Sequence, residues 1–118
     1  MTAPHRLVVK IRSDWQIGPF WVYRDEEAVP EPYLPEEISE VLPLEPELIA
    51  EIEAWDVSFQ NTFRPDDPAE SGFQDARQIQ EFDARGRLLA HKVKAAIPAD
   101  VTVRYVPLAG DGTEEITG

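Results

Sequence analysis

Few side chains in this sequence have the type and spacing that catalysis requires. The two histidines, His5 and His91, stand far apart in the chain, so neither belongs to a paired-histidine metal motif. The absence of cysteine excludes disulfides, thiolate ligands and cysteine nucleophiles, and it fits a reducing cytoplasm. The sequence also lacks a glycine-rich phosphate loop and a serine elbow. These features predict a protein that binds a partner, uses no cofactor or metal, and is not an enzyme.

Carboxylates are abundant and often adjacent. A general acid–base pair needs one carboxyl group that is desolvated, so that it holds its proton. Neighbouring acids beside prolines are more simply interpreted as solvated surface groups. The adjacent pairs are Glu26 with Glu27, Glu36 with Glu37, and Asp66 with Asp67.

The charge of the chain is large and unevenly distributed. The formal net charge is −12, and residues 25–56 contain twelve Asp or Glu without one Lys or Arg. Such a chain is unsuited to nucleic acid and to anionic membrane surfaces, and no apolar run is long enough to span a membrane. We therefore expect a cytoplasmic protein. The acidic run is either a solvated face that confers solubility or a surface that attracts a basic protein partner.

Aromatic side chains cluster just before the acidic run. The alternation of residues 20–23 places Phe20 and Val22 on one face of a strand and Trp21 and Tyr23 on the other. The second pair is either an exposed anchor for a partner or is covered by a fold-back of Tyr33 and the residue after it. The predicted partner-binding residues are Trp21, Tyr23, Glu26, Glu27, Glu36, Glu37 and Glu40.

Hydrophobic periodicity gives the elements that would position these residues. Period-two alternation predicts strands at 7–12, 20–23 and 101–106, the first two antiparallel. Prolines in residues 25–35 exclude a regular ladder there, and a short helix follows at 36–42. An apolar stripe predicts a helix over 46–63, and a capping box at Ser71 predicts a second helix reaching residue 96.

The expected fold is α+β, with about three strands and two main helices packed on one face of the sheet. The order is β-β-(short α)-α-α-β. Residues 1–107 form this single domain, and residues 108–118 form a flexible acidic tail. Gly86 interrupts the apolar stripe of the second helix, which indicates close approach of the facing helix through Trp55 or Phe59.

Several packing and capping segments resemble small acidic actinobacterial proteins of uncharacterised families. The segments are residues 42–48 (LPLEPEL), Trp55 and Phe59, residues 82–90 (FDARGRLLA) and residues 101–105 (VTVRY). Some proteins of this group have the size and acidity of immunity proteins that neutralise polymorphic toxins. The resemblance implies an acidic immunity or inhibitor module whose target is a basic toxin or nuclease. The alternative is a structural or regulatory domain that forms a homodimer through the aromatic strand face.

Overall fold

The computed structural model describes residues 7–24, 29–67, 71–109 and 112–117. Its strands are β1 (Val8–Ile11), β2 (Phe20–Tyr23), β3 (Glu31–Tyr33), β4 (Thr102–Tyr105) and β5 (Glu114–Ile116). Its helices are the 3-10 helix η1 (Ile38–Glu40) and the α-helices α1 (Pro46–Gln60) and α2 (Ala76–Ala96).

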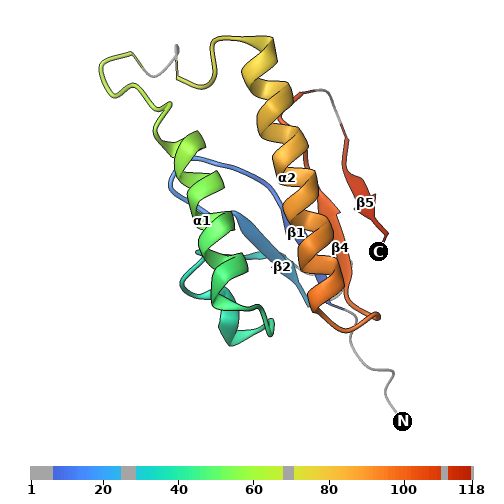
Figure 1. The fold of residues 1–118 in the computed structure, drawn as a ribbon. Helices are drawn as coiled ribbons and strands as arrows, with labels where there is room; N and C mark the ends of the chain where they lie inside the picture. The colour runs from blue at the N-terminus through green and yellow to red at the C-terminus, as the bar shows by residue number, and fades with distance from the viewer. Residues whose placement is uncertain (1–6, 25–28, 68–70, 110–111, 118) are drawn as a thin grey trace.

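The strands form one mixed sheet in the order β3-β2-β1-β4-β5. β1 runs antiparallel to β2, as predicted, and parallel to β4, which the chain reaches through both helices. α1 and α2 lie side by side on one face of the sheet (Figure 1). Their apolar stripes cover the inward side chains of the strands, among them Val9, Phe20 and Val103, all fully buried. Within the described ranges, neither α-helix lies on the opposite face of the sheet.

The sheet has five strands in the described residues, so the prediction of about three was wrong. β3 lies in the proline-containing stretch from which a ladder had been excluded. Pro32 is accommodated because β3 is an edge strand, where one backbone N–H can be missing without breaking the interior ladder. β5 lies within residues 108–118 and pairs with β4, and its Ile116 is buried.

We expect Ile116→Ala to lower the free energy of unfolding by about 2 kcal/mol, because it removes buried methyl groups from the core. Urea denaturation measures the change. Val29→Ala is the matched control, since Val29 is 86% exposed and should change stability by less than about 0.5 kcal/mol. Equal stabilities of the two variants would mean that β5 contributes nothing to the fold.

The helices differ from the prediction mainly at their ends. α1 stops at Gln60 rather than residue 63, and the Thr62 hydroxyl donates to the backbone carbonyl of Phe59 at this end. The cap of α2 is Asp75, whose carboxylate accepts from the backbone N–H of Arg77, and not Ser71. The Ser71 hydroxyl instead accepts from the backbone N–H of Arg64. The predicted short helix at 36–42 is reduced to η1.

Candidate functional site

Exposed glutamates follow one another along η1 and the outer side of α1. Ile38, Leu42 and Leu44 anchor this part of the chain in the core, so the polar residues between them are turned to solvent. We call these residues the acidic segment: Glu36, Glu37, Glu40, Glu45, Glu47 and Glu53. Three of the predicted site residues therefore lie close together in the chain and are exposed. Glu26 and Glu27 lie outside the described residues.

Little of the negative charge in the acidic segment is neutralised. Within the described part of the chain, none of its glutamates forms an ion pair, and the Glu37 carboxylate accepts from the backbone N–H of Leu34. The basic half of α2 contacts α1 through Lys92, which pairs with Glu51 at 3.0 Å, outside the acidic segment. Asp56 is buried, and desolvation raises its pKa, so it is not part of this surface. The acidic segment therefore keeps an uncompensated negative charge.

Trp21 and Tyr23 lie on the face of the sheet opposite the helices. They are half-buried, and cations from β1 and its end lie over their rings. Lys10 Nζ is 5.0 Å from the Tyr23 ring centroid, and Arg12 Cζ is 4.9 Å from the Trp21 ring centroid. Arg104 of β4 is in register with Lys10 and so shares this face. We call it the open sheet face: Lys10, Arg12, Trp21, Tyr23 and Arg104.

The structure does not place the two predicted sets of site residues on one face. Tyr33 pairs with Phe20, so its side chain points to the helix-covered side and does not cover Trp21. The chain then continues into η1, whose Ile38 is buried in the same helix-side core. The acidic segment therefore lies with the helix layer, whereas the aromatic pair lies with cations on the other side of the sheet.

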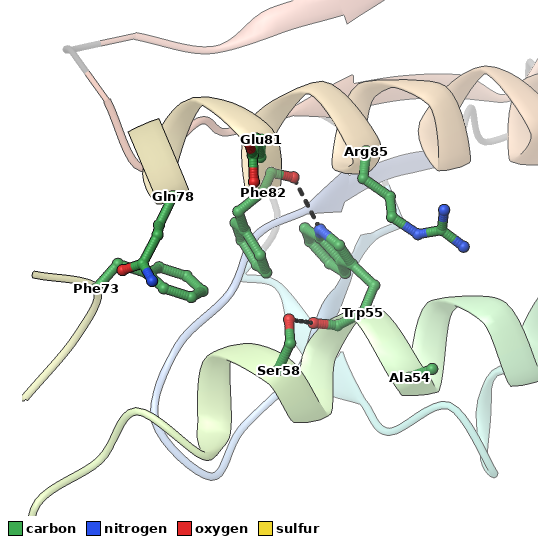
Figure 2. Close-up of a pocket in the computed structure, with 8 residues that line it drawn as sticks. All are labelled: Ala54, Trp55, Ser58, Phe73, Gln78, Glu81, Phe82 and Arg85. Atoms are coloured by element: carbon green, nitrogen blue, oxygen red, sulfur yellow. Dashed lines mark hydrogen bonds between the residues drawn. The ribbon is translucent and has the colours of Figure 1, made fainter. Parts of the chain in front are cut away.

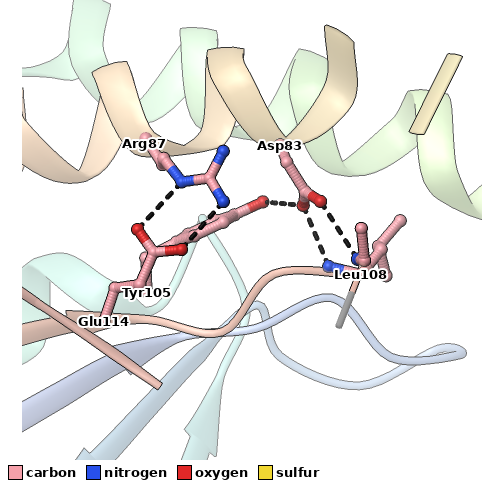
Figure 3. Close-up of polar contacts among 6 residues, drawn as sticks. Asp83, Arg87, Tyr105, Leu108 and Glu114 are labelled. Atoms are coloured by element: carbon pink, nitrogen blue, oxygen red, sulfur yellow. Dashed lines mark hydrogen bonds and ion pairs between the residues drawn. The ribbon is translucent and has the colours of Figure 1, made fainter. Parts of the chain in front are cut away.

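A buried polar cluster joins α2 to the chain after β4, and sequence reasoning missed it (Figure 3). Asp83 is 1% exposed. One of its oxygens accepts from the Tyr105 hydroxyl at 2.7 Å and from the backbone N–H of Leu108 at 2.9 Å. The other accepts from the backbone N–H of Ala109 at 3.1 Å. Burial, together with the bond to Asp83, raises the pKa of Tyr105, so its hydroxyl stays protonated and donates.

A second contact beside this cluster holds β5. The Arg87 guanidinium donates two hydrogen bonds to the Glu114 carboxylate, at 2.9 and 2.8 Å, and lowers the pKa of Glu114. Asp83 and Arg87 stand four residues apart, a spacing that favours an ion pair within a helix, but the two side chains have different partners (Figure 3). Both groups therefore fix the end of the chain to α2, which is a structural role.

A groove opens between α1 and α2 on their outer side (Figure 2). It is open to solvent and has a volume of about 330 Å³. The rings of Trp55 and Phe82 stack across the helices with centroids 4.5 Å apart, and the Trp55 indole N–H donates to the Phe82 carbonyl at 3.0 Å. The residues that line the groove are Ala54, Trp55, Ser58, Phe73, Gln78, Glu81, Phe82 and Arg85.

The described residues contain no group of three or more His, Asp or Glu side chains arranged to hold a metal ion. Neither α-helix in this part of the chain is long and apolar enough to cross a membrane. His91, the one histidine in the described ranges, is exposed on α2.

Comparison with protein-family models finds a match over residues 7–108 to the family described as Serratia CdiI immunity protein-like. The match covers every element except β5. A search of curated proteins found no match. The family match supports the immunity-protein part of the resemblance seen in residues 42–48, 82–90 and 101–105.

Proposed function

The chain belongs to the Serratia CdiI immunity protein-like family, and from this premise we propose that it is an immunity protein. It neutralises a toxin by binding it, without catalysing a reaction. The proposal includes a cytoplasmic location, which the absence of cysteine fits.

The acidic segment is the contact that we propose for the toxin, and the toxin surface that it meets is basic, such as the substrate-binding surface of a nuclease. The observation that carries this proposal is the uncompensated charge of the acidic segment within a chain of net charge −12. Complementary fields raise the rate at which two proteins meet, and they reject partners of the same sign. Glu36, Glu37 and Glu40 would guide a cationic surface to the η1 end of the molecule.

The open sheet face fits a homodimer less well. In a two-fold symmetric contact each residue meets the same patch of the second copy. Arg12 and Arg104 are paired with Asp14 at 3.0 Å and with Glu115 at 3.9 Å, but Lys10 forms no ion pair within the described residues. Lys10 of one copy would then approach the cations of the other, and like charges held together oppose association. Trp21 and Tyr23 therefore suit a different partner surface better than a second copy of this chain.

We expect the triple variant Glu36→Gln, Glu37→Gln, Glu40→Gln to associate with the cognate toxin about tenfold more slowly at low salt. The toxin is sought in the gene immediately upstream. Glutamine keeps the side-chain length and the acceptor that Glu37 offers to Leu34, so the fold should be retained. Stopped-flow measurements at low and at high ionic strength test the effect, and the difference from the unchanged protein should shrink at high salt.

The matched control removes the same charge elsewhere on the surface. Asp66→Asn, Asp67→Asn and Asp100→Asn together also neutralise three exposed carboxylates, all outside the acidic segment. If both triple variants slow association equally, net charge alone would govern binding and the acidic segment would have no special role. If the toxin binds neither variant nor the unchanged protein, the immunity function itself would be contradicted.

A further inference from the structure

We propose that the groove between α1 and α2 is a second contact for the partner protein. It receives one aromatic side chain of the partner together with a carboxylate next to it. This inference rests on the proposed function only for the identity of the partner.

The floor and one end of the groove are aromatic. Trp55 and Phe82 stack at its centre, and the half-buried Phe73 closes the end near the start of α2, with its ring centroid 5.2 Å from that of Phe82 (Figure 2). Ala54 contributes only a methyl group on the α1 side, so the space above the rings stays open. A cavity of about 330 Å³ is large enough for one aromatic side chain. Aromatic rings are the commonest anchors in such surface pockets.

At the other end of the groove, the positive charge of Arg85 favours a carboxylate beside the partner's aromatic ring. Arg85 is exposed and makes no ion pair or hydrogen bond within the described residues. Glu81, the acidic group that lines the groove, is already paired with Arg77 at 3.2 Å. An unpaired guanidinium beside an apolar cavity binds a carboxylate better than a neutral or cationic group.

Two further groups lie beyond this end of the groove. Leu88 lies about one turn beyond Arg85 on the same side of α2, and it is 53% exposed. The ion pair between Lys92 and Glu51 then links the two helices. The residues that line the groove nevertheless span only Ala54 to Ser58 on α1, about one turn, and end at Arg85 on α2. Its length suits one anchor side chain and its neighbours rather than a long helix.

The first test uses three dipeptide probes and needs no toxin. N-acetyl-Phe-Glu-amide should shift the indole N–H signal of Trp55 in a nitrogen–proton NMR spectrum, while the indole signal of Trp21 on the open sheet face stays unchanged. The Phe-Gln probe should bind about threefold more weakly, the size expected of one exposed ion pair, and the Phe-Lys probe more weakly still. Arg85→Gln should abolish the difference between the Phe-Glu and Phe-Gln probes. Absence of a Trp55 shift, or equal binding of all three probes, would overturn the proposal.

The second test asks whether the toxin occupies the groove. Ala54→Phe fills the cavity from α1 and should weaken toxin binding about tenfold, mainly through faster dissociation. Ala95→Phe, the same change at an exposed position near the end of α2, should leave binding unchanged. If the dipeptide binds but both variants bind toxin equally well, the toxin is not the occupant and the proposal fails. The triple variant of the acidic segment would still slow association in that case, so the proposed function is tested separately.

Discussion

Gly86→Ala should lower the free energy of unfolding by about 2 kcal/mol, and Gly86→Leu by about 4 kcal/mol or enough to prevent folding. A Cβ atom at Gly86 would lie 2.5 Å from the Tyr105 ring and hydroxyl and 2.7 Å from the Trp55 ring. Neither ring can move aside cheaply, because the Trp55 indole is bonded to the Phe82 carbonyl and the Tyr105 hydroxyl to Asp83. Thermal and urea denaturation of both variants measure the loss.

The sign of the stability change in Gly86→Ala shows whether close packing or intrinsic helix propensity dominates at this position. In an exposed helix position, alanine is about 1 kcal/mol more favourable than glycine. Ala84 is such a position on the same helix, so Ala84→Gly should destabilise the protein by about that amount. At position 86 we expect the opposite: the protein with glycine should be more stable than the protein with alanine. If Gly86→Ala stabilises the protein, α2 does not pack against Trp55 and Tyr105 as closely as the structure indicates.

The close contact at Gly86 could be predicted from sequence, because glycine weakens a helix and is favoured inside an apolar stripe chiefly where a neighbour needs the space of a side chain. Trp55 or Phe59 was expected over the gap, and Trp55 lies there. Tyr105 was not, since its approach depends on the parallel pairing of β4 with β1, and neither strand encodes that pairing in its own alternation. Sequence reasoning therefore predicted which residues face inward and that β1 and β2 are antiparallel neighbours, but not that β4 pairs with β1.

The two edge strands could not be predicted for a related reason. β3 has three residues, one of them proline, and β5 has three residues, two of them acidic. Edge strands pair on one side only and need little hydrophobic pattern, so their pairing is decided by the rest of the sheet. Ile116 was the one apolar residue that could have indicated β5.

The role of the predicted site residues stays a prediction, but their exposure can be compared with expectation. The exposure of Glu36, Glu37 and Glu40 agrees with the expectation from composition. Sequence alone could not show that the cations of β1 and β4 share a face with Trp21, because that depends on strand register. The acidic segment and the open sheet face are therefore separate surfaces, although Arg12 and Arg104 of the second are paired with Asp14 and Glu115. A partner is expected to recognise one surface or the other.

Asp83 is a buried group that sequence reasoning missed, although a signal was present. Ile79, Asp83, Gly86 and Ala90 follow at helical spacing, which places Asp83 in a row of largely apolar positions. Arg87 follows four residues later, a spacing that fits a surface ion pair equally well. A carboxylate in such a row must be satisfied by several donors, and the chain after β4 supplies them.

Asp83→Ala should therefore lower the free energy of unfolding by about 3 kcal/mol. The change leaves the buried Tyr105 hydroxyl and the backbone N–H groups of Leu108 and Ala109 without their acceptor, and donors bonded to a charged group lose the most. Denaturant unfolding measures the loss, and faster amide hydrogen exchange at Leu108 and Ala109 locates it. Asp75→Ala, which removes an exposed helix cap on the same helix, should cost only about 1 kcal/mol. Equal losses in the two variants would show that the Asp83 carboxylate contributes no more than an exposed cap, and that the end of β4 is held by apolar packing alone.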